Sequence, residues 1–425
     1  MDIAKHWIHI RIPSYSPGTS RSRRKRRKGI AKHMGDVSYD DTTTASPRPR
    51  HLNVRREYVN TLSSNSNRLA SPNRFRKSQD LTAVIVAYDR SSSGIASYTL
   101  DLASLLSEGL DCHVVAFDPF EEDRPPFRVI NLCSKKSRFP HYFPLIYGLE
   151  DRRQVRDIIG EIDADVVIET LPPIASSLRN VVSLKWGYVG YAELALIRAS
   201  QLRFPLTLGA LPVTAQHWLG DWMSFRNAQT VLNASGWGNQ VIPPPARIRP
   251  LKGSNSDGVL RILFVSRDIH LRRKNLAVVL NALKHVRREA ELHIVGRGHV
   301  VGEKVICHGP MERSEVLDLM RQCDALVLPS TYEELGYVGL EASSLGLAVI
   351  ASDIPSFRFA VPNAIFFNPT NVAELSSILA HTSLDEFRSV GISCRAAAIQ
   401  MRRAALERIL LIAERMREDR NASAR

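Results

Sequence analysis

The sequence predicts an α/β protein with two doubly wound, Rossmann-like domains. Short apolar runs that suit buried strands alternate with amphipathic stretches that suit helices, as in Leu81 to Phe117 and Leu260 to Leu283. This alternation is typical of parallel sheets that are covered on both faces. Between the two series lie Pro243 to Pro245 and the polar segment Gly253 to Gly258. The composition of this stretch predicts a linker between two domains.

The first 80 residues differ from the rest of the chain in charge and in pattern. They hold 18 Lys and Arg against 6 Asp and Glu, and the whole chain of 425 residues has a formal net charge of +14. The basic run Arg21 to Gly29 lies among Ser, Thr, Pro and Asn with no apolar period, which is typical of disorder. We expect a disordered tail over residues 1–80. It either contacts nucleic acid or an anionic membrane without specificity or has no function, and specific nucleic-acid binding is not predicted.

The remaining length suits two domains, each large enough for its own core. We place an N-terminal domain over residues 81–250 and a C-terminal domain over residues 258–385. A helical segment over residues 386–420 follows, and arginine is frequent on its polar side. Its predicted apolar face contains Cys394, Ala398, Met401, Ala405, Ile409, Ile412 and Met416. Such a helix either packs on a domain or lies on a membrane surface.

Composition indicates a cytoplasmic protein. No apolar stretch approaches the roughly 18 to 20 residues that a membrane span requires, and the N-terminus lacks the apolar core of a signal peptide. The cysteines are scattered, and neither a CxxC nor an HExxH pattern suggests a metal. We expect reduced thiols at Cys112, Cys133, Cys307, Cys323 and Cys394.

The N-terminal domain begins with a predicted strand, loop, helix and second strand. Apolar residues recur at helical spacing in this segment and predict one buried helix face, formed by Ile95, Tyr98, Leu102, Leu105 and Leu106. The loop Ser91 to Gly94 follows the first strand, at the sheet edge where ligands bind in open parallel sheets. Further strands are expected at Val129–Leu132, Asp165–Ile168, Pro205–Leu208 and Thr230–Leu232.

The most informative segment of the C-terminal domain is PSTYEELGYVGLEASSLG, Pro329 to Gly346. The run Ala325 to Leu328 predicts a buried strand before it, Gly336 predicts a tight turn, and the last glycine predicts a helix end. Such a turn aims unpaired backbone N–H groups and the positive end of the helix dipole at a ligand above the sheet. Carboxylates at Glu333 and Glu341 can accept hydrogen bonds from hydroxyls. Phosphate donors beside hydroxyl acceptors suit a sugar nucleotide.

These residues resemble the E-x7-E motif of retaining glycosyltransferases with the GT-B fold, most closely family GT4. The resemblance covers roughly residues 81–420 and implies two Rossmann-like domains that face each other across a cleft, with the last helix crossing back to the N-terminal domain. It implies that Glu333 contacts hydroxyls of the donor sugar and Glu341 those of the ribose. Backbone amides around Gly336 approach the phosphates, so the donor-binding set also includes Leu335, Tyr337 and Val338.

The segment Leu260 to Leu283 resembles the place where GT4 enzymes hold the donor diphosphate with an arginine and a lysine. Arg267 and Lys274 are the candidates in this chain. The family spaces this pair more closely, so Arg272 or Arg273 are alternatives to Lys274. Fixed cations suit this position because a leaving nucleoside diphosphate develops negative charge. A solvated basic loop is the alternative interpretation.

Two further glycines are candidate donor contacts. Gly94 ends a loop that resembles the Gly-rich loop facing the donor phosphates in GT-B enzymes. Gly296 and Gly298 follow a predicted strand, but the next glycine is Gly302, and this GxGxxxG spacing does not match a dinucleotide fingerprint. We interpret Gly296 as backbone that approaches the nucleotide, with a plain loop as the alternative.

The acceptor side departs from the family pattern. Many GT4 enzymes carry a histidine after the strand that here is Asp165 to Pro173, and this chain has Thr170 near that place. His217, which stands beside Trp218 and Trp222, is the candidate acceptor-site residue. A packed or rim position for this histidine is the alternative.

The resemblance therefore implies transfer of a hexosyl unit from a nucleoside diphosphate sugar to a hydroxyl of a glycan, lipid or small molecule, with retention. In the front-face mechanism that it suggests, the departing phosphate oxygen takes the acceptor proton. Arg267 and Lys274 stabilise its charge, Glu333 contacts the sugar, neither glutamate is a covalent nucleophile, and no metal or other cofactor is required. Two alternatives stay open: an epimerase-like GT-B enzyme, and a noncatalytic nucleotide-sugar-binding protein tethered by its basic tail.

Overall fold

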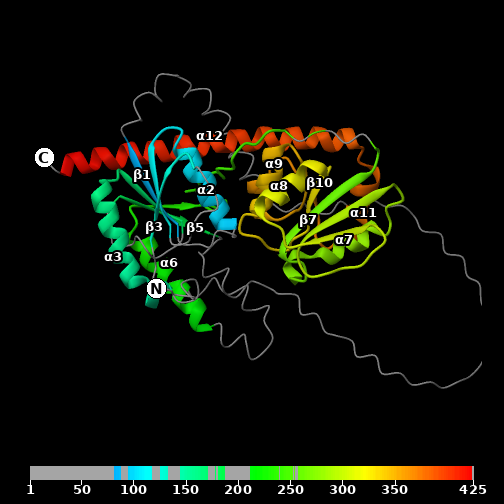
Figure 1. Cartoon of the computed structure of the whole chain (residues 1–425), viewed down its shortest axis with the longest axis horizontal. Coiled ribbons are helices and arrows are strands. Elements are labelled where there is room, and N and C mark those ends of the chain that lie inside the picture. Colours follow the sequence, from blue (N-terminus) through cyan, green and yellow to red (C-terminus); the bar gives the residue numbers. More distant parts are fainter. Residues whose placement is uncertain are drawn as a thin grey trace, which may run out of the picture. The chain divides into compact units, whose positions relative to one another are not determined.

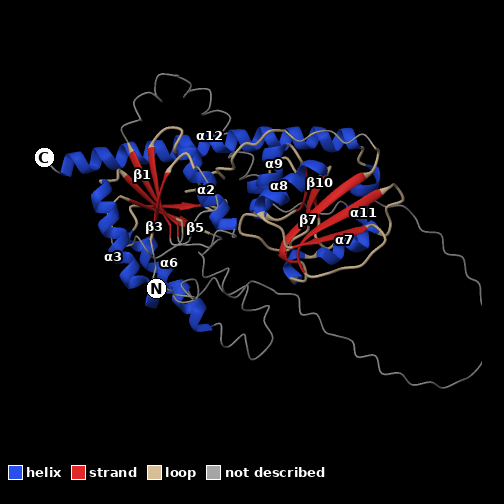
Figure 2. Cartoon of the chain, in the orientation of Figure 1, coloured by secondary structure: helices blue, strands red, loops and turns tan. Residues whose placement is uncertain are grey.

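The computed structural model describes residues 81–87, 94–116, 125–132, 144–170, 178, 180–186, 211–238, 240–251, 253 and 257–423. The predicted disordered tail, most of the loop Ser91 to Gly94 and the strand expected at Pro205–Leu208 lie outside these residues. The described part of the chain contains two parallel six-stranded sheets, each packed with helices (Figures 1 and 2). The predicted α/β fold class is thereby confirmed.

The N-terminal sheet has the strand order β3-β2-β1-β4-β5-β6, and its neighbouring strands are parallel. Its elements are β1 Thr82–Ala87, α2 Gly94–Leu106, β2 Asp111–Ala116, β3 Arg128–Asn131, α3 Pro144–Ile162, β4 Val166–Glu169, β5 Val181–Lys185, α6 Leu211–Asn227 and β6 Thr230–Asn233. The strands predicted at β3, β4 and β6 are confirmed to within about one residue. Strand β5 was missed by the sequence analysis.

The C-terminal sheet has the order β12-β11-β10-β7-β8-β9. Its elements are β7 Leu260–Asp268, η4 Arg272–Lys274, α7 Leu276–Leu283, β8 Ala290–Arg297, β9 Val305–Gly309, α8 Arg313–Gln322, β10 Ala325–Leu328, α9 Tyr337–Leu345, β11 Ala348–Ser352, α10 Pro355–Ala360, β12 Ile365–Phe367 and α11 Val372–His381. Read from β9, this order is the same as in the N-terminal sheet, with β7 in the place of β1.

In both sheets, the direction in which the chain adds new strands therefore reverses at a corresponding point. The chain builds one half of each sheet outward from its first strand, and the fourth strand then starts the other half on the opposite side. The reversal lies between β1 and β4 in one sheet and between β7 and β10 in the other. Loops that leave two such strands diverge and open a crevice at their carboxyl ends, where ligands bind in doubly wound folds. We call these two places the N-terminal and C-terminal switch points.

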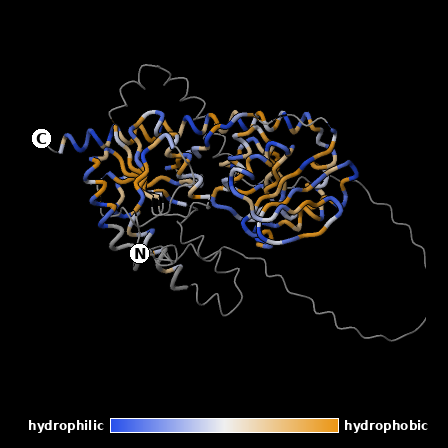
Figure 3. Tube along the Cα trace, viewed as in Figure 1, coloured by the Kyte–Doolittle hydropathy of each residue, from blue (hydrophilic) through white to orange (hydrophobic). Residues whose placement is uncertain are grey.

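The strands around each switch point are buried on both faces. β4 and β10 are buried along their whole length, and their apolar runs suit strands that helices cover on both sides. Figure 3 colours the strands of both sheets mainly as hydrophobic. The predicted face of α2 also packs into the core: Tyr98, Leu102, Leu105 and Leu106 are buried and Ile95 is partly buried.

The last helix, α12 Leu384–Ser423, contains 40 residues and is about 60 Å long at 1.5 Å per residue. Phe387 of this helix packs into the C-terminal core, whereas Met401 and Ala405 pack into the N-terminal core (Figure 1). Of the predicted apolar face, all members are buried except Ile412, which is partly buried. Among the described helices, none is both long and apolar enough to cross a membrane.

The segment predicted as a linker is extended and partly covered. Pro243, Pro244 and Pro245 are buried, and Arg402 of α12 donates from Nη1 to the Pro245 carbonyl at 2.9 Å. The chain therefore passes between the sheets in contact with the last helix. Four of the cysteines lie among the described residues and form no disulfide with one another, namely Cys112, Cys307, Cys323 and Cys394.

Candidate active site

The turn predicted between β10 and α9 is present at the C-terminal switch point. Gly336 is the N-cap of α9 with φ 71°, and Gly346 caps its other end with φ 74°. A Cβ atom on Gly336 would lie 2.2 Å from Cε1 of Phe357, so a larger residue does not fit. The first N–H groups of α9 have no helical acceptor. They lie at the carboxyl edge of the sheet, where the helix dipole favours an anion.

Glu333, in the loop before this turn, contacts two cations. Arg273 Nη1 donates to Glu333 Oε1 at 2.8 Å, and Lys274 Nζ forms an ion pair with the same oxygen. Ser330 Oγ also donates to it at 3.1 Å. Burial opposes ionisation of the carboxyl, but the charges of Lys274 and Arg273 hold the pKa of Glu333 below its usual value. The three charged groups form a cluster with one excess positive charge.

Both cations come from η4, in the loop after β7. Their side chains are mostly buried, with 11% of Arg273 and 17% of Lys274 exposed. The loops after β7 and β10 are joined by two bonds: Thr331 N donates to Arg273 O at 2.8 Å, and Asn275 Nδ2 donates to Pro329 O at 3.2 Å. These bonds explain why a lysine distant in sequence reaches Glu333.

Arg267 occupies a different position from Lys274. It is exposed near the end of β7 and makes no ion pair with any described side chain, and the same holds for Arg272. Of the cations considered from the sequence, the structure therefore brings Lys274 and Arg273 together with Glu333. Arg267 lies outside this cluster.

Glu341 lies inside α9 and contacts a residue that the sequence analysis missed. Its Oε1 accepts a hydrogen bond from Arg313 Nε at 2.6 Å, and Arg313 Nη2 lies 3.5 Å from Asp101 Oδ1 of α2. Asp101 Oδ2 in turn accepts from the Tyr337 hydroxyl at 2.5 Å. Arg313 is 28 positions from Glu341 and 212 from Asp101. No local pattern connects these residues, so only the fold reveals them.

The other predicted donor residues surround the start of α9. Leu335 and Tyr337 are buried in the same apolar cluster as the N-terminal sheet, and Val338 is partly buried against the C-terminal core. Gly94, the first residue of α2, is exposed, and a Cβ placed on it would lie 3.7 Å from Cβ of Tyr337. The fold thus brings Gly94 beside the turn at Gly336.

Gly296 has a structural reason to be glycine. It has φ 139° near the end of β8, and a Cβ there would lie 1.8 Å from the Ser266 carbonyl oxygen of β7. A Cβ placed on Gly298 would likewise lie only 2.6 Å from Cγ1 of Ile269. The close approach of backbone at Gly296 is therefore an approach to the neighbouring strand, where the β7–β8 register shifts. This packing requires glycine whatever ligand binds nearby.

Two residues considered for the acceptor side have different positions. Thr170 is fully buried at the end of β4, its hydroxyl donates to Val86 O at 3.1 Å, and its carbonyl accepts from Trp186 Nε1 at 2.8 Å. These bonds account for Thr170 as a core residue. His217 lies in α6, but its side chain is outside the described part of the structure.

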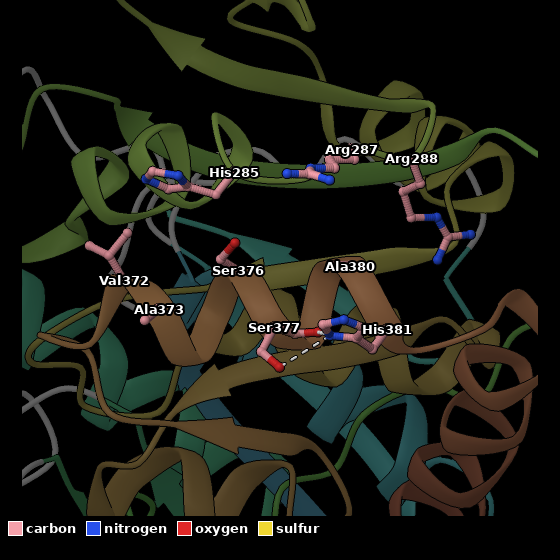
Figure 4. A pocket seen from close by; sticks show the side chains of 9 residues that line it. All are labelled: His285, Arg287, Arg288, Val372, Ala373, Ser376, Ser377, Ala380 and His381. Atoms are coloured by element: carbon pink, nitrogen blue, oxygen red, sulfur yellow. Dashed lines mark hydrogen bonds between the residues drawn. The ribbon is translucent and has the colours of Figure 1, made fainter.

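A separate pocket lies away from these residues. It has a volume of about 760 Å³ between the end of α7 and α11, and its lining is His285, Arg287, Arg288, Val372, Ala373, Ser376, Ser377, Ala380 and His381 (Figure 4). The loop that supplies Arg287 and Arg288 immediately precedes β8. The pocket therefore follows α11 from Val372 to His381, and none of the predicted site residues lines it.

Comparison with known sequences finds a family match within the C-terminal domain. Residues 260–383 match the family described as Glycosyl transferases group 1. This range begins at β7 and contains Lys274, Glu333, Gly336 and Glu341. The C-terminal domain is therefore similar to group 1 glycosyltransferases over these residues.

Two curated relatives match part of the chain. The D-inositol 3-phosphate glycosyltransferase of Xylanimonas cellulosilytica is 26% identical over 160 residues, which are 33% of this chain and 38% of that protein. The glycogen synthase of Mycobacterium tuberculosis is 36% identical over 92 residues, or 21% of this chain and 22% of that protein. The chain thus matches well under half the length of these relatives.

Solved structures resemble the fold over most of the chain. Sucrose-phosphate synthase from Thermosynechococcus elongatus has a TM-score of 0.53 at 15% identity and covers 81% of this chain and 100% of that one. Anabaena Alr3699/HepE, in complex with UDP and glucose, has a TM-score of 0.54 at 14% identity and covers 80% and 100%. The two sheets and their helices therefore form the predicted GT-B fold.

Proposed function

We propose that this protein is a retaining, GT4-like glycosyltransferase that moves a hexosyl unit from a nucleoside diphosphate sugar to an acceptor hydroxyl. One observation carries the proposal: at the C-terminal switch point, Lys274, Arg273 and Glu333 adjoin the left-handed turn at Gly336 that begins α9. Cations and free amides suit a diphosphate, and the carboxylate suits sugar hydroxyls. The complex of Alr3699/HepE with UDP and glucose supports a donor of this class.

In this proposal the donor diphosphate competes with Glu333 for Lys274. A diphosphate at the start of α9 draws the ammonium group, and Arg273 remains bonded to Glu333 Oε1. The other carboxylate oxygen, Oε2, carries none of these contacts and accepts a hydrogen bond from the donor sugar, while the Arg273 bond keeps the carboxylate oriented. The cluster is thus organised before the donor arrives, which lowers the cost of reorganisation during the reaction.

Transfer needs no protein nucleophile in this arrangement. As the bond to the sugar breaks, the departing phosphate oxygen gains negative charge and takes the proton of the acceptor hydroxyl on the same face. Lys274, Arg267 and the first amides of α9 stabilise that charge. This set supplies the positive charge that a divalent metal provides in other transferases, so we propose that transfer proceeds without one.

The test separates Glu333 from Glu341, since we assign the first to the sugar and the second to the ribose. Glu341→Ala should weaken binding of the nucleoside diphosphate by about 1.5 to 3 kcal/mol, because the hydrogen bond to the ribose is made by the free nucleoside diphosphate as well as by the intact donor. Glu333→Ala should leave that binding nearly unchanged and slow transfer. Titration calorimetry with UDP, GDP and ADP and turnover assays with the matching sugar donors measure both, with Glu414→Ala, exposed on α12, as the control.

Each outcome has a defined meaning. Equal effects of both substitutions on both measurements would overturn the role assignment, and no effect of either would overturn the glycosyltransferase proposal. Turnover of the nucleotide sugar without an acceptor would indicate an epimerase-like enzyme instead. Binding of the donor with no turnover for any acceptor would indicate a noncatalytic binding protein.

For the acceptor side we propose a peripheral contact with an anionic membrane. Trp218 and Trp222 are 57% and 48% exposed at a spacing of four on α6, and the Arg226 guanidinium lies 5.4 Å from the centre of the Trp222 ring. Tryptophan and arginine side by side suit a lipid headgroup region. The basic tail, which has 18 Lys and Arg in 80 residues, adds attraction to anionic lipid.

Flotation with lipid vesicles tests this contact. The full chain should float with phosphatidylglycerol vesicles at low salt and much less with phosphatidylcholine, and Trp218→Ala with Trp222→Ala should reduce flotation. Leu411→Ala is the matched control, because Leu411 is a 50% exposed apolar residue on α12. Equal flotation of the tryptophan variant and the wild type would contradict a contact through α6.

A further inference from the structure

Asp101, in the middle of α2, joins three separate segments through one buried carboxylate. Its side chain is 2% exposed. Oδ2 accepts from the Tyr337 hydroxyl at 2.5 Å and from the Arg247 backbone N–H at 2.9 Å. Oδ1 lies 3.5 Å from Arg313 Nη2 and 4.0 Å from Arg249 Nη2. A helix of the N-terminal sheet is therefore bonded to α8, to α9 and to the segment that connects the sheets.

Arg313 divides its guanidinium between two carboxylates. Its Nε donates to Glu341 Oε1 at 2.6 Å, and its Nη2 faces Asp101. Burial opposes its charge, but the carboxylates of Glu341 and Asp101 raise the pKa of the Arg313 guanidinium above its usual value. A planar guanidinium held at two of its nitrogens has little freedom to rotate. Arg313 therefore fixes one oxygen of Glu341.

The other oxygen of Glu341 is available to a ligand. Only Oε1 bonds to a described residue, whereas Oε2 has no partner within the described part of the chain. A carboxylate with one anchored and one unbonded oxygen presents a fixed acceptor for a hydroxyl group. The side chain of Glu341 is 10% exposed, so this oxygen lies in a partly dry environment in which a hydrogen bond is strong.

Asp101 also holds the other end of the proposed donor site. Tyr337 is the first residue of α9, so its backbone N–H belongs to the turn where the proposed function places the phosphates. Burial, together with the charge of Asp101, raises the pKa of the Tyr337 phenol well above its usual value, which keeps its hydroxyl a hydrogen-bond donor. The Tyr337 ring meets Tyr98 of α2 edge-on, with ring centres 6.2 Å apart.

We propose that Asp101 and Arg313 are positioning residues of the donor site. Arg313 orients Glu341 for the ribose of a nucleoside diphosphate, and Asp101 holds both Arg313 and the phosphate end of α9. This inference rests on the proposed function of Glu341. It implies that the N-terminal sheet is needed for nucleotide recognition, although the residues assigned to contact the ribose belong to the C-terminal domain.

A double-mutant cycle on the full chain tests whether Arg313 acts through Glu341. The measured quantity is the Kd for UDP, GDP or ADP, whichever the wild type binds. Arg313→Ala should weaken this Kd by roughly 3- to 30-fold in the wild-type background and by less than about 2-fold in a Glu341→Gln background. Arg321→Ala is the matched control, because Arg321 lies on the same helix and pairs with Asp318 at the surface. It should leave the Kd unchanged.

Two milder variants keep the test decisive if Arg313→Ala does not fold. Arg313→Lys keeps the positive charge but loses the planar guanidinium that contacts two carboxylates at once. This variant should therefore bind with a Kd between those of the wild type and Arg313→Ala. Asp101→Asn keeps an oxygen for Tyr337 and Arg247 but removes the charge that faces Arg313. It should raise the Kd and leave the melting temperature unchanged. Tyr337→Phe or a core substitution, by contrast, should lower the melting temperature.

The outcomes distinguish this inference from the proposed function. If Glu341→Gln weakens the Kd and Arg313→Lys, Arg313→Ala and Asp101→Asn do not, the positioning role is wrong and the proposed function stands. If Arg313→Ala weakens binding equally in both backgrounds, Arg313 does not act through Glu341. If the wild type binds none of the three diphosphates and transfers no sugar, the proposed function fails first and the positioning role fails with it.

Discussion

The two switch points occupy corresponding places in sheets of the same strand order, but they carry different chemistry. At the N-terminal one, β4 ends at Glu169, which accepts a hydrogen bond from Ser183, and the next residue, Thr170, bonds to Val86 and Trp186. Glu169 and Thr170 are both fully buried and hydrogen-bonded. At the C-terminal one, the loops hold Lys274 and Glu333 in a charged, mostly buried cluster. Strand order provides a crevice in both sheets, and the side chains decide which crevice suits a phosphate.

The comparison also shows what the N-terminal sheet contributes. Its first helix, α2, places Gly94 near Tyr337 and bonds Asp101 to the start of α9. The N-terminal switch point therefore stands beside a helix that supports the C-terminal one.

Removing a cation from the C-terminal switch point should slow transfer most. Lys274→Ala and Arg267→Ala are each expected to reduce turnover by roughly 10- to 1000-fold, because each removes an electrostatic stabiliser of the leaving group. Arg272→Ala, a change at an exposed residue of the same loop, is the control and should retain normal turnover. Initial rates at saturating donor measure the effect. Normal rates in both variants, with a loss in Arg273→Ala, would transfer the role to Arg273.

Glycine should be essential at one switch point and replaceable at the other. Gly336→Ala forces an L-residue into the left-handed region, which costs roughly 1 to 2 kcal/mol, and its Cβ meets Phe357 at 2.2 Å. The free energy of unfolding should therefore fall by more than that amount. A methyl group on Gly94 meets only ordinary contact with Tyr337, at 3.7 Å, so Gly94→Ala should keep its stability. Denaturant titration of both variants measures the free energy of unfolding. Equal losses of stability in Gly336→Ala and Gly94→Ala would contradict the expected difference between the two glycines.

The charged cluster should make stability depend on pH. The pKa of Glu333 in the folded protein lies below its usual value, so its ion pairs stabilise the fold at pH values above its unfolded pKa of about 4.3. That contribution is lost as pH falls through the folded pKa. The difference in free energy of unfolding between the wild type and Glu333→Gln should be largest near pH 7 and shrink below about pH 4. A difference that does not change between pH 7 and pH 3 would contradict an ionised Glu333.

The smallest effect is expected at the N-terminal switch point. Thr170→Val removes the hydrogen bond to Val86 O while keeping the shape of the side chain, so it should cost about 1 kcal/mol of stability. Transfer rate and donor affinity should stay at wild-type values. A changed KM for the acceptor would show that Thr170 contributes to the acceptor site after all. The same assays on Ser183→Ala, a change at another buried donor in this sheet, provide the control.

Much of the fold could be predicted because its signals are local. The turn at Gly336, the helix end at Gly346 and the strand before them each depend on a few adjacent residues. β5 was missed because Val181–Lys185 is a short run that follows no clear helical segment, so neither length nor periodicity marks it. Arg273 was considered only as an alternative to Lys274, since sequence spacing does not show that both side chains reach one carboxylate.

The sequence by itself determined the alternation of strands and helices, the glycine turns and the type of charge near the C-terminal switch point. These features follow from backbone preferences and apolar periods, which act over a few residues. Only the tertiary structure decided which charges meet. The contact between Arg313 and Asp101 spans 212 positions, and it exists because the packing of α8, α9 and α2 brings their side chains together. Packing between distant segments has no local code, so the supporting half of the donor site became visible only in the folded chain.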